Sequence, residues 1–181
     1  MSSQALQAFV HAIQDSTDLL KLFDALNTKP PPPHIEVLKR ASLVMALAAL
    51  ETYFEDRITE AVSTTCGPKN ALSDFYRNSL QADLKLFHSP STDRVRQIFQ
   101  KYLSIDISEA WNWNNCDPHM AKAELNRLVK KRGDIAHRSL RPAVGEAQPR
   151  EHPVTRDHLR KHIHFITQIA TTTDKFLAEQ I

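Results

Sequence analysis

Arg132 and His137 are the residues whose types and spacing best suit chemistry. They lie five positions apart in LNRLVKKRGDIAHRS, a segment in which Leu125, Leu128 and Val129 repeat at helical spacing. The next position on that apolar face is Arg132, so an arginine replaces a core residue there. A buried guanidinium is costly unless it is paired or faces a functional cavity. The segment therefore predicts either a structural ion pair or a site that uses a cation and an imidazole.

The spacing alone favours the structural alternative. Arg132 could pair with Glu51 or Glu55, which are four positions apart and so share one face of an earlier helix. His137 could cap the carboxyl end of its own helix. An arginine and a histidine at this spacing occur by chance in many proteins, so the chemical alternative needs support from the rest of the chain.

Helical periodicity dominates the elements that must position these residues. Apolar residues recur at helical spacing in six segments, at about 3–26, 35–63, 71–87, 92–102, 118–137 and from Thr155 onward. A proline run at 29–33, the sequence CGPKN at 66–70 and a Pro-rich loop at 141–153 interrupt them. The chain has only 3 glycines and no convincing strand. We predict an all-α, single-domain helical bundle of about six helices over residues 1–181.

Two of these segments carry more specific predictions. The stretch from Ala41 to Leu50 is apolar nearly all round, which indicates the central buried helix. The segment at 71–87 is expected to pack through one stripe of apolar residues (Leu72, Phe75, Leu80, Leu84 and Phe87).

Composition excludes several classes of function. A net charge of +2 does not by itself indicate a nucleic-acid-binding protein, so any basic surface must be local. Cys66 and Cys116 form no CxxC pair, which argues against a zinc or thioredoxin motif and fits a reducing cytosol. The N-terminal stretch lacks the pattern of a signal peptide, and no apolar run approaches the ~20 residues of a membrane span. We expect a cytoplasmic protein with no membrane association, metal or cofactor.

Two other groups of residues are weaker candidates. His158 and His162 are four positions apart and could chelate a metal, but a solvated polar face is the favoured interpretation. With Arg156, Arg160, Lys161 and His164 they could instead form a basic strip for an RNA backbone. Trp111 and Trp113 could stack on bases, although packing of their loop against the core is favoured.

Three stretches of the chain together resemble one known family. RASLVMALAALETYFEDRI resembles that family's long helix, DRVRQIFQKYLSIDISEAW its middle helix, loop and tryptophan, and LNRLVKKRGDIAH its "RNxIAH" segment. The chain thus resembles the RiboL-PSP-HEPN group of the HEPN superfamily, whose signature R-x4-H corresponds to Arg132 and His137. The resemblance is strongest over residues 40–140.

The resemblance implies a helical bundle that dimerises, brings two R-x4-H motifs together and cleaves RNA without a metal. RNA carries its own nucleophile, the 2′-hydroxyl, so cleavage needs a base, an acid and positive charge on the phosphorane. Two motifs would supply two histidines and two arginines. Glu51 would support Arg132, with Asp134 as a second supporting residue, and Lys130, Lys131 and Arg138 would bind RNA. Such domains are often toxins or antiphage effectors, so an antitoxin protein is a candidate partner.

The chain departs from the family pattern next to each motif residue. Gly133 stands where active members usually have Asn, Asp or His, and Arg138 stands where a glycine is common. The first departure favours a non-catalytic HEPN module that binds RNA, nucleotide or a partner protein. A purely structural dimerisation domain is the third class of function that the residues allow.

Overall fold

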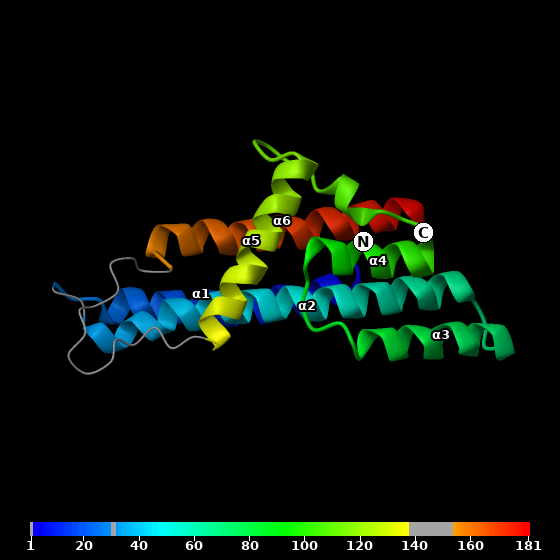
Figure 1. Ribbon diagram of the computed structural model, residues 1–181, viewed down its shortest axis with the longest axis horizontal. Coiled ribbons are helices and arrows are strands. Elements are labelled where there is room, and N and C mark those ends of the chain that lie inside the picture. The colour runs from blue at the N-terminus through cyan, green and yellow to red at the C-terminus, as the bar shows by residue number, and fades with distance from the viewer. Residues whose placement is uncertain (1, 30–31, 138–153) are drawn as a thin grey trace.

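The protein is an all-α bundle, as predicted. The computed structural model describes residues 2–29, 32–137 and 154–181, and within these ranges it contains six α-helices and no β-strand. The helices are α1 (Gln4–Leu26), α2 (Glu36–Cys66), α3 (Ala71–Leu84), α4 (Thr92–Leu103), α5 (Pro118–His137) and α6 (Arg156–Gln180), with short 3-10 helices η1 (Pro33–Ile35) and η2 (Ile107–Ala110) (Figure 1). The Pro-rich loop predicted at 141–153 lies outside the described residues.

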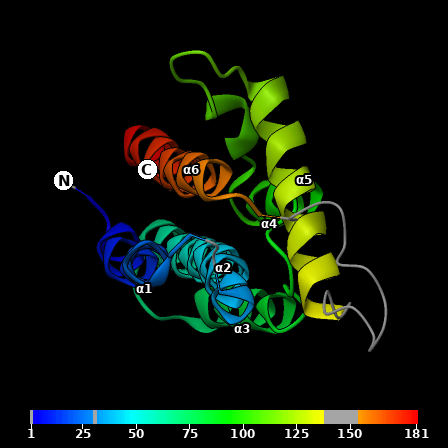
Figure 2. The same ribbon diagram turned by 90° about the vertical axis from the view of Figure 1, so that its left-hand side faces the viewer.

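The long helices run roughly parallel to one axis, and α5 crosses them. α1 and α2 form an antiparallel hairpin, α6 packs along both, and α3 and α4 flank α2 (Figure 1). Viewed along that axis, α5 lies across the bundle while the other helices are seen nearly end-on (Figure 2). Helix α5 contacts α2, α4 and α6, so residues along its length meet different neighbours.

Local chemistry sets the helix ends near their predicted positions. The Ser3 hydroxyl accepts a hydrogen bond from the Leu6 N–H at the start of α1. Helix α2 continues to Cys66 and ends at Gly67, whose φ of 62° is a left-handed conformation that glycine adopts without strain. A capping box then begins α3, because Asn70 and Ser73 each accept the other's backbone N–H.

Helix α2 is the central element of the hydrophobic core, as its all-round apolar stretch predicts. Leu43, Leu47 and Leu50 are fully buried, and residues from all six helices join the same core. Trp111 is also fully buried and donates its indole N–H to the Thr173 hydroxyl, 2.9 Å away, which confirms packing as its role. No helix among the described residues has the length and apolar character to cross a membrane.

The apolar stripe predicted for the segment at 71–87 is wrong at two of its five residues, and the helix itself ends at Leu84. Leu80 and Phe87 are buried and Leu84 packs against the core, but Leu72 and Phe75 are 75% and 69% exposed. The inward position near the start of α3 is Ser73, which the capping box holds close to α2. The apolar pattern suggests a wider contact face than the neighbours of α3 cover, because its contacts with α4 come from Tyr76, Ser79 and Asp83 rather than from Leu72 and Phe75.

Candidate functional site

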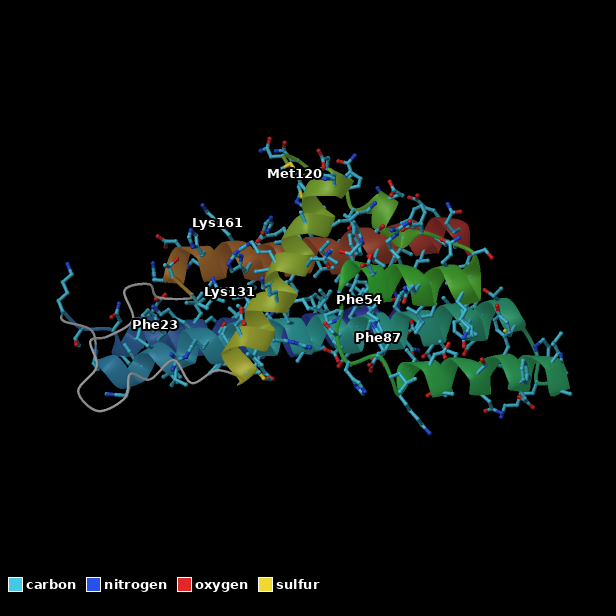
Figure 3. The ribbon with its side chains drawn as sticks, viewed as in Figure 1. Phe23, Phe54, Phe87, Met120, Lys131 and Lys161 are labelled. Carbon is cyan, nitrogen blue, oxygen red and sulfur yellow. The ribbon has the colours of Figure 1, made fainter. Side chains whose placement is uncertain are left out.

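Arg132 lies in the second half of α5, where this helix crosses α2. Its Nη1 donates to Glu51 Oε2 at 2.5 Å, and both side chains are 20% exposed. Glu51 follows the buried run of α2, so the structure selects Glu51 rather than Glu55 as the ion-pair partner of Arg132. Figure 3 labels Met120 at the other end of α5 and Lys131 beside the crossing. The arginine is therefore partly sheltered and held by a carboxylate on a different helix.

A second contact ties Arg132 to the loop between α3 and α4. Its Nη2 donates to the backbone carbonyl of His88 at 2.9 Å. The loop is fixed on the other side by α5, because the Thr92 N–H donates to Asn126 Oδ1 at 2.9 Å and the Thr92 hydroxyl donates to the Lys122 carbonyl at 3.1 Å. The guanidinium is thus positioned by two hydrogen bonds that it donates, one to α2 and one to the loop between α3 and α4. A guanidinium has five N–H donors, which is more than these two hydrogen bonds use.

Glu55 lies one turn after Glu51 on α2, and its electrostatic surroundings are unusual. Burial raises the pKa of Glu55, and the negative charges of Glu51 and Asp56 raise it further, whereas His88 acts in the opposite direction. Glu55 is therefore a carboxyl that ionises less readily than usual, and His88 is one of the groups that act on it. Perturbed carboxyls of this kind are common at functional sites.

The other predicted site residues differ in how much of them the structure describes and in how exposed they are. His137 is the last residue of α5, and its side chain, like the whole of Arg138, lies outside the described residues. Asp134 is half-buried, and Lys130 is exposed. Burial lowers the pKa of Lys131, and the charge of Arg127 lowers it further, which places this lysine on the face of α5 that carries Arg127.

A second glutamate–arginine–histidine cluster joins α5 to α6. Arg127 donates two hydrogen bonds of 2.7 Å to the carboxylate of Glu124, and His162 Nδ1 lies 3.4 Å from the same carboxylate. Burial raises the pKa of Glu124, but the hydrogen bonds from Arg127 and His162 outweigh it and lower that pKa to about 2. Among the described residues, His162 Nε2 has no hydrogen-bond partner.

This cluster corrects the prediction of a solvated histidine face. His162 is only 5% exposed, because the turn of α6 that carries it packs against α5. The described residues contain no group of three His, Cys, Asp or Glu side chains placed to hold a metal ion. In the basic strip, Arg156 and Arg160 both pair with the single carboxylate of Asp24 on α1, which offsets part of the positive charge of the strip.

The bundle and the R-x4-H segment at the end of its crossing helix define a HEPN protein. The family model RiboL-PSP-HEPN matches residues 11–179, and the chain belongs to this family. No curated protein and no solved structure matched the chain in the corresponding searches.

The residue that sequence reasoning missed at this site is His88. It stands in HSPSTD, a segment that the sequence marks only as a break between two helices. Its contact with Arg132 spans 44 positions and uses a backbone carbonyl, so no side-chain pattern could reveal it. The only available signal was an isolated histidine directly before a helix start.

Proposed function

We propose that this protein is a metal-independent endoribonuclease that acts as a dimer, with Arg132 and His137 of both subunits in one composite site. Membership of a HEPN family supports the proposal. The observation that carries it is the placement of Arg132, which is partly exposed and fixed by Glu51 and the His88 carbonyl. An arginine held this way can receive a phosphate without reorganising its own side chain.

In the proposed reaction the RNA 2′-hydroxyl attacks the adjacent phosphorus, and the bond to the 5′-oxygen breaks. His137 transfers a proton, since an imidazole can act as acid or base near neutral pH. Arg132 stabilises the charge of the phosphorane, and Glu51 positions Arg132. Asp134 is a second supporting residue, and Lys130, Lys131 and Arg138 bind the RNA backbone. The products are a 2′,3′-cyclic phosphate and a 5′-hydroxyl.

The alternative is a non-catalytic HEPN module that binds RNA, nucleotide or a partner protein. Two observations favour it. Gly133 supplies no polar side chain beside Arg132. The ion pair between Arg132 and Glu51 would also serve a purely structural role, because it links α5 to α2.

A ribonuclease of this kind damages the cell that makes it unless it is controlled. The proposal therefore extends to a role as a toxin or antiphage effector, with an inhibitory antitoxin protein as partner. This proposed role depends on the ribonuclease activity, and a protein without that activity would not have it.

Cleavage of bulk RNA in EDTA by purified protein tests the proposal. We expect wild type to release 2′,3′-cyclic phosphate ends and Arg132→Ala and His137→Ala to lose about 10²- to 10⁴-fold in rate. Arg127→Ala is the matched control, because it removes an arginine from the same helix and should retain cleavage. Circular dichroism checks that each variant is folded. RNA binding without cleavage by wild type would select the non-catalytic module instead, and neither binding nor cleavage would leave a structural domain.

A further inference from the structure

His88 lies in the loop between α3 and α4, with its backbone tied to the candidate catalytic arginine and its side chain exposed. Its backbone carbonyl accepts from Arg132 Nη2 at 2.9 Å, so the position of its main chain is tied to the guanidinium. Phe87 and Pro90, on either side, are both buried and anchor the short loop against the core. The imidazole between them remains exposed. An anchored backbone with a free side chain is the arrangement expected of a group that acts on a ligand.

The surroundings of His88 are those of a proton-transfer group. The Glu55 carboxyl on α2 lies close enough to interact electrostatically with it, and this interaction opposes the effect of burial on the pKa of Glu55. A carboxylate near an imidazole can orient the ring for proton transfer. The charged residues on the elements around this loop are Glu51 and Glu55 on α2, Arg132 on α5, and Lys85 and Arg94 on its two flanks; of these, Glu55 interacts electrostatically with His88 and Arg132 contacts its backbone carbonyl.

We propose that His88 is a further catalytic residue of the same site, which exchanges a proton with one of the two reacting oxygens of RNA. This inference rests on the proposed ribonuclease function. RNA cleavage moves two protons, one off the 2′-hydroxyl and one onto the leaving 5′-oxygen, while the new O–P bond forms and the old P–O bond breaks. His88 and His137 divide these two transfers. Each subunit then carries both proton-transfer groups, and the dimer joins two such sets.

The first test replaces only the imidazole. His88→Gln keeps the backbone carbonyl that Arg132 contacts, so the arginine should stay in place. We expect kcat/KM to fall about 10²- to 10⁴-fold and the bell-shaped pH profile to lose one limb. His11→Gln is the matched control, since His11 is exposed on α1, away from the α2–α5 crossing. A wild-type rate with both limbs intact in His88→Gln would overturn the inference while leaving the ribonuclease function standing.

The second test asks how many copies of His137 one site needs. Wild-type and His137→Ala subunits are co-expressed with different tags, and dimers are isolated over a range of mixing ratios. If His88 supplies one transfer, one His137 is enough, so mixed dimers stay active and activity falls less steeply than the square of the wild-type fraction: it falls linearly if a mixed dimer has half the wild-type activity, and more slowly if it has more. A fall with the square of that fraction would mean that two copies of His137 do both transfers, and His88 would be excluded. Absence of cleavage by wild type would refute the proposed function and this inference together.

Discussion

Two clusters of a glutamate, an arginine and a histidine share helix α5, and they are built in different ways. In the α5–α6 cluster, Glu124 and Arg127 are three positions apart on one helix, and His162 is buried against them. At the α2–α5 crossing, the arginine reaches a carboxylate on α2 and a backbone carbonyl in a loop. There the imidazole is exposed rather than buried.

Glu124 also differs from Glu55, the carboxyl group that lies one turn after Glu51 on α2. In the α5–α6 cluster the hydrogen bonds from Arg127 and His162 outweigh the effect of burial and lower the pKa of Glu124 to about 2. At the crossing, burial and neighbouring negative charge raise the pKa of Glu55. When folding lowers the pKa of a carboxyl group, its negative charge stabilises the folded state. When folding raises the pKa, the negative charge destabilises the folded state. The comparison therefore predicts that the α5–α6 cluster serves stability and the crossing serves chemistry.

The substitution expected to separate the two clusters most clearly is Glu51→Gln, which removes one carboxylate charge at the α2–α5 crossing. Glu51→Gln weakens the interaction that positions Arg132. Misplacement of a catalytic side chain lowers the rate of reaction about 10- to 100-fold. The loss should fall on kcat more than on KM, because the guanidinium acts on the transition state. Cleavage kinetics with a defined RNA measure both constants. Glu51→Asp should recover part of the rate, and an unchanged kcat in Glu51→Gln would mean that Arg132 needs no such support.

The matched substitution in the α5–α6 cluster should affect stability instead. The folded-state pKa of Glu124, about 2, lies below its ordinary value of 4.5, so its contribution is complete above pH 4.5 and is lost as the pH falls toward 2. Because Glu124 is partly solvated, we expect Glu124→Gln to destabilise the protein by about 1–2 kcal/mol at neutral pH. Urea unfolding at several pH values measures this difference, which should shrink in acid. A loss of cleavage at unchanged stability would erase the distinction between the clusters.

The sequence predicts the elements far better than the contacts between them. Helix α2 and its buried stretch follow from local periodicity, and the end at Gly67 follows from the conformational freedom of glycine. The pairing of Arg132 with Glu51 is one of two options in the sequence, because Glu51 and Glu55 share one face of the helix and only packing can choose between them. The position of α2 and its end at Gly67 are predicted correctly because the chemistry of a single segment decides both.

The failures all depend on what a neighbouring element covers. Phe75 fits the apolar pattern of α3, yet nothing among the described residues buries it. His162 looks like part of a polar face, but α5 packs over it and brings Glu124 to its ring. His88 lies in a linker whose position is set by a backbone contact with Arg132. Tertiary contacts of this kind leave no periodic trace in the sequence.

The smallest predicted effect concerns Gly133, which follows Arg132 directly on α5. A Cβ atom added there would meet no atom within 4 Å, so Gly133→Ala introduces no clash. Alanine lowers the conformational entropy of the unfolded chain, which stabilises a helix by about 0.5–1 kcal/mol relative to glycine. Thermal unfolding should show a rise of about 1–4 °C.

The rate of RNA cleavage by Gly133→Ala tells whether the glycine has a second role. The residue is already helical in the structure, so the substitution should leave the rate unchanged. A faster enzyme would indicate that looseness at this end of α5 limits the site. A more stable but slower enzyme would indicate that Arg132 and His137 meet RNA only when the helix bends at Gly133, and the crossing would then differ from the α5–α6 cluster in flexibility as well as in exposure.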